Sequence, residues 1–371
     1  MKILHVITSL KIGGAESALA NFLSATINDG NIHYVVYFYS GPNREKIENL
    51  GIKTFQIDGL FSKYDIFAYL KLKKIIKKIS PDLIHSSLWL ANFYSKFIAS
   101  SLKIPIICDL HSNFLHDGRI RIFLEKLNLL KADKYVAVSN NVKNGFLKCF
   151  ESQAEKLNEK ITVIENGIDI NLIKSKSQNI DKSFLGFNSS DFVFGAVGRL
   201  ETVKSYDVLI RAFASLKKDI KNTKLCFVGS GSQEFFLKEL VNSLGLSKKI
   251  IFMGNQTNPY GFYKIFDCFV ISSKSEGLSI ALLEAMAFGL PIISTKYSDR
   301  HDLLENNING LLVEPGNLLA LKDAMQKIYE DKGLRVLMGK NNIELIEKRY
   351  SIEHVVNSYN KSYCNLFFSS L

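Results

Sequence analysis

Short apolar runs alternate with amphipathic stretches along the first half of the chain. The runs at 2–9, 34–39, 83–84, 105–110 and 135–138 are compact and apolar, which is typical of buried strands. Stretches with helical spacing of apolar residues separate them. Strands that alternate with helices predict βαβ units and a parallel sheet.

The same pattern starts again after about residue 170. Further strands are predicted at 191–197, 224–228, 249–253, 267–271, 291–294 and 310–313. The stretch 171–190 is polar and rich in Lys, Ser and Asn, which indicates a linker together with the lead-in to the second domain. The chain is therefore expected to be α/β, with two doubly wound Rossmann-like domains facing across a cleft and ligands at the carboxyl ends of the strands.

Length, composition and charge exclude some classes of protein and favour others. A length of 371 residues fits two domains, and 47% apolar with 22% charged residues excludes a disordered or fibrous protein. The formal charge of +11 favours an anionic partner, either nucleic acid, a phosphorylated ligand or a membrane. Five scattered cysteines without a Cys-x-x-Cys pair predict free thiols in a reducing compartment. We expect neither a signal peptide nor a membrane-spanning segment.

The positive charge is concentrated in one region. Residues 51–150 hold 16 basic and 7 acidic side chains. Within 69–80, apolar residues follow helical spacing on one face, and the remaining positions include Lys71, Lys73, Lys74, Lys77 and Lys78. One interpretation is an ordinary surface helix packed on the sheet. The other is a lysine face that binds anionic lipid headgroups, worth about 1 kcal/mol per Lys.

The strongest chemical signal lies at 272–291. Ser279 is placed as the N-cap of a helix over 280–288, so the positive end of this helix points to the carboxyl edge of the sheet and suits a phosphate. Glu276 precedes the helix and Glu284 lies inside it. Carboxylates accept hydrogen bonds from paired hydroxyls, which predicts contacts with sugar or ribose. The alternative is that Glu276 caps the helix and Glu284 lies on the surface.

A second signal adds positive charge at the same edge. Arg199 and Lys204 flank a short loop after the first strand of the second half. Arginine binds two phosphate oxygens with its forked guanidinium, and lysine acts as a point charge. The alternative is a pair of solvated loop cations.

The spacing of Glu276 and Glu284 resembles the Glu-x7-Glu signature of retaining glycosyltransferases of family 4, which have the GT-B fold. Other motifs of that family occur in the same order: Gly13-Gly14-Ala15-Glu16, Val138-Ser139-Asn140, Glu165-Asn166-Gly167-Ile168-Asp169, Gly198-Arg199…Lys204 and Gly229-Ser230-Gly231. The resemblance implies an acceptor-binding domain at 1–170, onto which a helix at 350–371 crosses back. It implies a nucleotide-sugar-binding domain at 171–349.

The resemblance also implies roles for single residues. Arg199 and Lys204 would bind the donor diphosphate and neutralise the leaving nucleotide. Glu284 would hold the ribose and Glu276 the donor sugar, and the backbone N–H groups of Ser279, Ile280 and Ala281 would face the phosphates.

In the first domain, Gly14 would allow close approach of the donor and acceptor. His111 matches the family's active-site histidine, and His116 would contribute if its loop folds inward. For His85, which also ends a strand, we favour a structural role.

Retaining chemistry in this family is described as front-face displacement, in which the departing phosphate helps to deprotonate the acceptor hydroxyl. We therefore expect no catalytic base, no cofactor and no essential metal, because the sequence has no Asp-x-Asp and Arg199, Lys204 and the helix end replace the cation. The alternative in the same fold is a nucleotide-sugar epimerase or another nucleotide-sugar enzyme.

Two other classes fit less well. A nicotinamide-dependent oxidoreductase lacks the third glycine of its fingerprint, because position 234 is Glu. A nucleic-acid-binding protein is suggested by charge alone, without a recognition motif, so we expect no nucleic-acid partner.

The expected substrates are a nucleotide-sugar donor, UDP favoured over GDP, and a glycan or lipid-linked acceptor of surface polysaccharide or glycolipid assembly. The expected location is cytoplasmic, with peripheral contact at the inner face of the cytoplasmic membrane. The segment 297–302 departs from the family, where a Gly-Gly turn and a Glu are frequent, so the sugar stays open.

Overall fold

The computed structural model describes residues 1–59, 65–112, 114, 118–216, 220, 222–276, 278–296 and 303–369. His116 and the segment 297–302, both considered above, lie outside these residues. The chain divides into unit 1, Met1–Gly167 with Ile352–Leu371, and unit 2, Ile168–Ser351.

Unit 1 is built on a seven-stranded parallel sheet of order β3-β2-β1-β4-β5-β6-β7. Its strands are β1 (Lys2–Ser9), β2 (Ile32–Tyr39), β3 (Lys53–Gln56), β4 (Leu83–Ser87), β5 (Ile106–Leu110), β6 (Lys134–Ala137) and β7 (Ile161–Val163). Central strands such as β4 and β5 are buried along their whole length, which is why they appear in the sequence as unbroken apolar runs.

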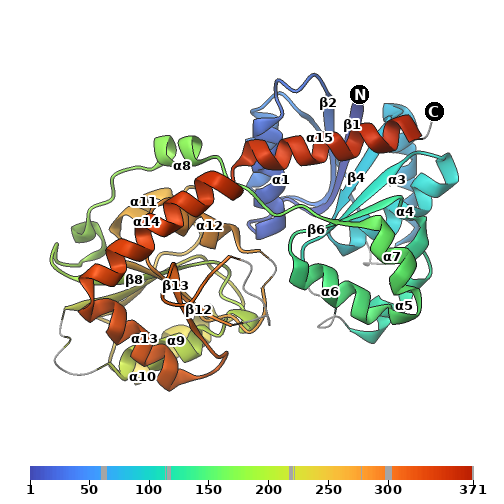
Figure 1. The fold of residues 1–371 in the computed structure, drawn as a ribbon. Coiled ribbons are helices and arrows are strands. Elements are labelled where there is room, and N and C mark those ends of the chain that lie inside the picture. The colour runs from blue at the N-terminus through green and yellow to red at the C-terminus, as the bar shows by residue number, and fades with distance from the viewer. Residues whose placement is uncertain are drawn as a thin grey trace. The chain divides into compact units, whose positions relative to one another are not determined.

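Helices cover both faces of this sheet. They are α1 (Gly14–Ala25), α2 (Asn43–Glu48), α3 (Ile66–Ile79), α4 (Trp89–Leu102), α5 (Arg119–Lys126), α6 (Asn140–Cys149), α7 (Ala154–Lys160) and α15 (Ile352–Ser369). Figure 1 shows α15, in red, lying alongside α1 in blue. Tyr359 and Tyr363 of α15 belong to the same apolar core as β1, β2 and β4, so the last helix completes unit 1.

A fully buried ion pair joins two helices of unit 1. Lys96 on α4 donates to Glu125 on α5, and neither side chain is more than 2% exposed. The hydroxyl of Tyr135 lies beside the same ammonium group, 3.4 Å away.

Unit 2 contains a second parallel sheet, of order β10-β9-β8-β11-β12-β13. Its strands are β8 (Phe192–Val197), β9 (Thr223–Val228), β10 (Ile250–Phe252), β11 (Cys268–Ile271), β12 (Ile292–Thr295) and β13 (Gly310–Val313). Its helices are α8 (Ile170–Lys176), α9 (Tyr206–Ala214), α10 (Glu234–Ser243), α11 (Tyr260–Ile265), α12 (Ile280–Ala287), α13 (Leu318–Glu330) and α14 (Lys332–Arg349). The expected fold class, two doubly wound Rossmann-like sheets, is confirmed.

Three details differ from the sequence-based expectation. The short edge strands β3 and β7 were not predicted. The stretch 171–190 is not a plain linker, because it holds most of α8 and a 3-10 turn at Lys182–Leu185. Helix α8 is stabilised by Asp169, whose side chain accepts from the backbone N–H of Leu172 at 2.8 Å, and by burial of Ile173.

Candidate functional site

Two loops at the carboxyl edge of the unit 2 sheet are tied together. The Nζ of Lys204, after β8, donates to Oε1 of Glu276, after β11. The hydroxyl of Ser272 donates to the Lys204 carbonyl at 2.7 Å, and the N–H of Lys274 donates to the Val203 carbonyl at 2.8 Å. The structure therefore brings together two of the residues that the sequence assigns to the site.

The Lys204–Glu276 pair is partly shielded from solvent, with side chains 16% and 14% exposed. The hydroxyl of Ser273 also donates to Oε1 of Glu276, at 2.6 Å. A fixed ammonium group beside a fixed carboxylate can bind an anion and a hydroxyl side by side. That arrangement suits a phosphate next to a sugar.

Backbone conformation explains why small residues occupy these loops. Gly229 follows β9 with φ of +137°, and a Cβ there would lie 2.1 Å from the Gly198 carbonyl oxygen. The loops after β8 and β9 thus pack backbone against backbone. Ser205 is buried with φ of 49°, in the left-handed region that glycine adopts more readily than other residues.

Arg199 lies on the same loop as Lys204. It is exposed, and in the described part of the chain it makes no ion pair. Nearby, hydrogen bonds from Ser232, together with the charge of Arg199, hold the pKa of Glu201 below its usual range. The guanidinium group is therefore accessible to a ligand anion.

Helix α12 begins where the sequence predicts. Ser279 is the N-cap residue with extended backbone, φ −73° and ψ 116°, but its hydroxyl makes no capping hydrogen bond. The first backbone N–H groups of a helix have no partner within the helix, so those at Ile280 and Ala281 are suited to an anion. Gly289, at φ +70°, ends the helix as predicted.

Glu284 is buried, only 6% exposed, so the alternative of a surface side chain is wrong. The hydroxyl of Tyr263, on α11, donates to its Oε2 at 2.7 Å. Burial and the adjacent Glu284 carboxylate raise the pKa of Tyr263 well above its usual value. Tyr263 was not identified from the sequence, where it appears as one aromatic residue among several in an apolar stretch.

In unit 1, His111 follows β5 and lines a small cavity of about 30 Å³. Ala15 on α1, Asn166 and Tyr359 on α15 line the same cavity. The Nε2 of His111 is buried without a hydrogen bond, and it lies 3.7 Å from Oδ2 of Asp109.

Gly14 is the first residue of α1, the helix whose Ala15 lines the cavity. Among the described residues, and apart from its chain neighbours and its own helix backbone, a Cβ at Gly14 would meet no atom within 4 Å. Packing within the protein therefore does not require glycine here. The proposed contact of Gly14 with a ligand stays a prediction.

His85 lies one strand from His111 and is 3% exposed. Its ring bonds to Asp109 through Nε2 at 2.7 Å and to Tyr363 through Nδ1 at 2.7 Å. Both ring nitrogens therefore have partners within the core, as expected for a structural histidine.

Two family models match the chain. One, described as Glycosyl transferases group 1, matches residues 177–345, and the other, Glycosyltransferase Family 4, matches 12–172. The chain belongs to the family 4 glycosyltransferases. Its two Rossmann-like units are those of the GT-B fold.

Similar proteins extend over nearly the whole chain. An alpha-1,4-N-acetyl-D-galactosaminyltransferase of a diNAcBac-PP-undecaprenol-linked glycan, from Campylobacter jejuni, is 26% identical over 96% of this chain and 96% of its own length. The capsular polysaccharide biosynthesis glycosyltransferase CapM of Staphylococcus aureus is 26% identical over 79% of this chain and 78% of its own. Anabaena HepE, solved in complex with UDP-glucose, has a TM-score of 0.84 at 22% identity and covers 99% of this chain and 100% of its own.

The lysine-rich helix α3 of this glycosyltransferase packs on unit 1 as its apolar pattern predicts. Leu72 and Ile76 are fully buried. The side chains of four lysines are exposed, and Lys73 lies over the ring of Tyr69 at 5.8 Å. The exposed lysines are Lys71, Lys74, Lys77 and Lys78.

Apolar side chains accompany these lysines. Ile66, Phe67 and Leu70, at the start of α3, are each more than half exposed. Ile120 and Phe123 of α5 are also exposed, at 69% and 64%. In the described residues no helix is long and apolar enough to cross a membrane.

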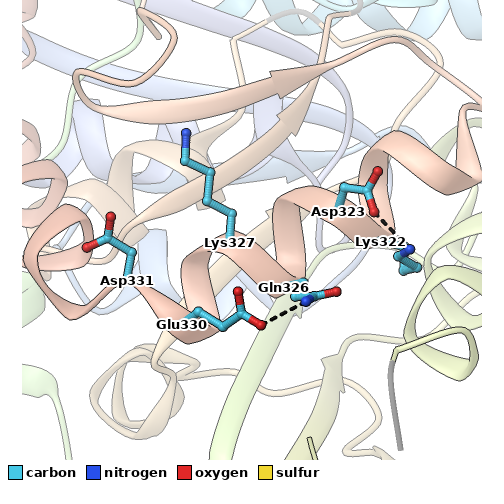
Figure 2. A pocket seen from close by; sticks show the side chains of 6 residues that line it. All are labelled: Lys322, Asp323, Gln326, Lys327, Glu330 and Asp331. Atoms are coloured by element: carbon cyan, nitrogen blue, oxygen red, sulfur yellow. Dashed lines mark hydrogen bonds and ion pairs between the residues drawn. The ribbon is translucent and has the colours of Figure 1, made fainter. Parts of the chain in front are cut away.

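A second hollow in the glycosyltransferase lies on α13 of unit 2, and Figure 2 shows its charged lining. Its side chains largely bind one another. Lys322 pairs with Asp323 at 2.8 Å, and Gln326 donates to Glu330 at 2.7 Å. None of the predicted site residues lines it, so it carries no part of the site.

Proposed function

We propose that this glycosyltransferase transfers a sugar, with retention of configuration, from a UDP-sugar to a hydroxyl group of a glycan or lipid-linked acceptor in surface polysaccharide or glycolipid assembly. The observation that carries this proposal is the Lys204–Glu276 pair beside the start of α12. It places an anion-binding ammonium and a hydroxyl-binding carboxylate at one sheet edge, which fits a phosphate linked to a sugar.

The proposed donor roles are those that the family resemblance implies, and this geometry supports them. Arg199 and Lys204 bind the diphosphate, together with the backbone N–H groups of Ser279, Ile280 and Ala281. Glu276 holds hydroxyls of the donor sugar, and buried Glu284, oriented by Tyr263, holds the ribose. The UDP and UDP-glucose bound by HepE support a uridine nucleotide over a guanosine nucleotide.

In the proposed reaction, the positive groups stabilise the leaving diphosphate as the glycosidic bond breaks. The departing phosphate takes the proton of the acceptor hydroxyl, and no protein base is required. His111 acts at the reacting face of unit 1. Arg199 and Lys204 supply the positive charge, so the reaction proceeds without an added metal ion or cofactor.

Thermal unfolding of the purified protein with UDP, GDP, ADP or NAD, in the presence of EDTA, tests the donor site. A ligand at 100 times its Kd adds about 2.7 kcal/mol of stability. We expect stabilisation by UDP and its loss in Arg199→Ala and Glu284→Ala. Lys322→Ala, on α13, is the matched control and keeps the shift. Stabilisation by NAD alone contradicts the proposal.

The stereochemistry needs a separate experiment. Proton NMR of the product made from UDP-glucose and a panel of aryl glycosides gives the anomeric configuration of the new bond. Retention predicts an α-linked product from the α-linked donor, and a β-linked product contradicts it. The epimerase alternative, which the comparisons do not support, predicts a changed sugar on UDP without an acceptor.

The acceptor proposal includes an anionic membrane surface. The relatives from Campylobacter and Staphylococcus, named for an undecaprenol-linked glycan and a capsular polysaccharide, support a lipid-linked or surface glycan. Exposed lysines on α3, next to exposed Ile66, Phe67 and Leu70, form a surface that combines positive charge with apolar side chains. Such a surface suits the headgroup region of a bilayer.

Flotation with vesicles that contain or lack anionic lipid tests this surface. We expect the Lys73/Lys74/Lys77/Lys78→Ser variant to bind anionic vesicles more weakly. The expected loss of binding free energy is about 1 kcal/mol per Lys. The matched control removes the same charge from exposed positions of unit 2, as Lys327/Lys332/Lys340/Lys348→Ser. Equal flotation of both variants contradicts the membrane proposal.

A further inference from the structure

A network of buried polar side chains surrounds one carboxylate in unit 1. Asp109, near the end of β5, is 5% exposed. Its Oδ2 accepts from Nε2 of His85 at 2.7 Å and from the hydroxyl of Ser87 at 3.0 Å. Its Oδ1 accepts from the hydroxyl of Tyr359, on α15, at 3.0 Å. Donors from two elements, β4 and α15, therefore fix the position of this carboxylate.

The protonation states in the network follow from its contacts. Burial alone would raise the pKa of Asp109, but electrostatic attraction to His85 and His111 and the hydrogen bond with His85 lower it below its usual range. An ionised carboxylate only accepts hydrogen bonds, so Nε2 of His85 is the donor. Nδ1 of His85 lies 2.7 Å from the hydroxyl of Tyr363, so both nitrogens of this ring have partners in the network.

A second histidine, His111, also lies near this carboxylate, but its Nε2 makes no hydrogen bond within the described part of the chain. Its Nε2 is buried and lies 3.7 Å from Oδ2 of Asp109. The titratable groups lining the cavity with it, among the described residues, are Asp109 from β5, His85 from β4 and Tyr359 from α15. Catalytic hydrogen bonds that are long in a free enzyme commonly shorten in the substrate complex.

We propose that Asp109 is the positioning residue of His111. The carboxylate accepts the Nε2 proton of His111, which fixes the ring and its tautomer and leaves Nδ1 as the nitrogen presented to the substrate. Tyr359 acts through Asp109, so the last helix of the chain helps to set the orientation of His111. This inference rests on the proposed role of His111 in sugar transfer.

The buried charge of Asp109, rather than its number of hydrogen bonds, argues for a role beyond structure. His85, Ser87 and Tyr359 already supply three donors, and the charge of Asp109 has no lysine or arginine partner among the described residues. A buried negative charge without such a partner is costly. Because this charge lies 3.7 Å from Nε2 of His111, it attracts the N–H of that ring more strongly than a neutral acceptor would.

NMR of the full chain tests the Asp109–His111 contact without any assay of transfer. The protein is labelled with ¹⁵N-histidine, with UDP present, and His111→Gln assigns the His111 signal among the seven histidines. We expect Nε2 of His111 to be protonated, with a downfield Nε2–H signal. Asp109→Asn abolishes the downfield shift, and Ser87→Ala, which removes another donor to the same oxygen, keeps it. An identical His111 signal in wild type and Asp109→Asn overturns the proposal.

Turnover of UDP-glucose, by transfer or hydrolysis, gives the second test. We expect Asp109→Asn to lower kcat by about 10- to 100-fold, change the pH profile of kcat and leave the Kd for UDP unchanged. The Asp109→Asn/His111→Gln double variant is expected to be no slower than His111→Gln alone. Losses that multiply in the double variant overturn the proposal.

Two outcomes need separate treatment: an Asp109→Asn variant that does not fold, and a wild type that shows no turnover. If Asp109→Asn does not fold, Tyr359→Phe replaces it, with a smaller loss of kcat in the same direction that also vanishes in the His111→Gln background. If the wild type turns over no UDP-sugar of a panel that includes UDP-glucose, the donor part of the proposed function fails. The NMR comparison then still decides the Asp109–His111 pair.

Discussion

Lys204 and Glu276, 72 positions apart in the chain, form one hydrogen-bonded pair in unit 2. The two side chains carry opposite charges and have different proposed partners. Lysine binds the diphosphate, and glutamate binds the sugar. Their substitutions are therefore expected to act in opposite directions on nucleotide affinity.

Lys204→Met removes a charged donor to the diphosphate and leaves Glu276 as an unpaired negative charge beside it. We expect UDP affinity to fall by about 1.5–3 kcal/mol in calorimetric titration. Glu276→Gln removes the negative charge, so UDP affinity is retained or increased while turnover of UDP-glucose is lost. Equal losses of UDP affinity in both variants contradict these roles.

Tyr263→Phe tests the buried hydrogen bond to Glu284. The variant keeps the aromatic ring but leaves one lone pair of a buried carboxylate without its donor, at a cost of about 1–3 kcal/mol. We expect lower thermal stability of unit 2 and weaker UDP binding. Tyr260→Phe, on the same helix, is the matched control, since the hydroxyl bonded to Glu284 at 2.7 Å is that of Tyr263. Unchanged UDP binding in Tyr263→Phe contradicts the role of Glu284 in holding the ribose.

Lys96→Met tests the buried ion pair between α4 and α5. Removing one partner leaves the Glu125 carboxylate buried and uncompensated, which typically costs 3–5 kcal/mol, so we expect a loss of about that size. Trp89, the only tryptophan in the sequence, lies in unit 1, so its fluorescence in urea follows this unit.

Two variants complete this experiment. Lys126→Met, at an exposed position of α5, is expected to change stability by no more than about 0.5 kcal/mol. Lys96→Met/Glu125→Gln is expected to recover part of the loss, because the unpaired charge is gone. A Lys96→Met protein as stable as Lys126→Met contradicts the prediction.

The histidines at the centre of unit 1 predict a pH dependence of stability. Burial, then the charges of His85 and His33, lower the pKa of His5 well below 6.5, and burial lowers that of His33. Because the unfolded chain binds these protons more tightly, stability is fully present above about pH 6.5 and falls as the pH decreases below it.

Urea unfolding followed by Trp89 fluorescence at pH 7.5 and 5.5 measures this dependence. Each histidine changes the free energy of unfolding by at most about 1.4 kcal/mol per pH unit. His5→Asn is expected to reduce the difference between the two pH values, since one of the two protons is no longer taken up on unfolding. The same difference in wild type and His5→Asn contradicts the assignment.

Local pattern predicts the elements of this fold better than it predicts their contacts. Strand β1 and helix α12 were predicted nearly to the residue, because unbroken apolar runs and cap residues are local signals. The polar composition of 171–190 predicts a linker, but most of α8 lies in this stretch. Capping by Asp169 stabilises this helix in spite of its polar composition.

The site residues show the same contrast. The spacing of Glu276 and Glu284 is visible in the sequence, but burial of Glu284 against Tyr263 is not, because it depends on how α11 packs beside α12. The bond between Tyr359 and Asp109 joins residues 250 positions apart. No local pattern carries a contact of that kind.

The place of α15 in unit 1 has a consequence for synthesis on the ribosome. Unit 2, residues 168–351, is a continuous segment and has all its strands before the last helix is made. Unit 1 is begun first but lacks part of its core until Tyr359 and Tyr363 have been added. At about 5–20 residues per second, that delay after residue 167 is on the order of 10–40 seconds. Unit 1 therefore stays incomplete and accessible to chaperones and proteases during this time, while unit 2 can already fold.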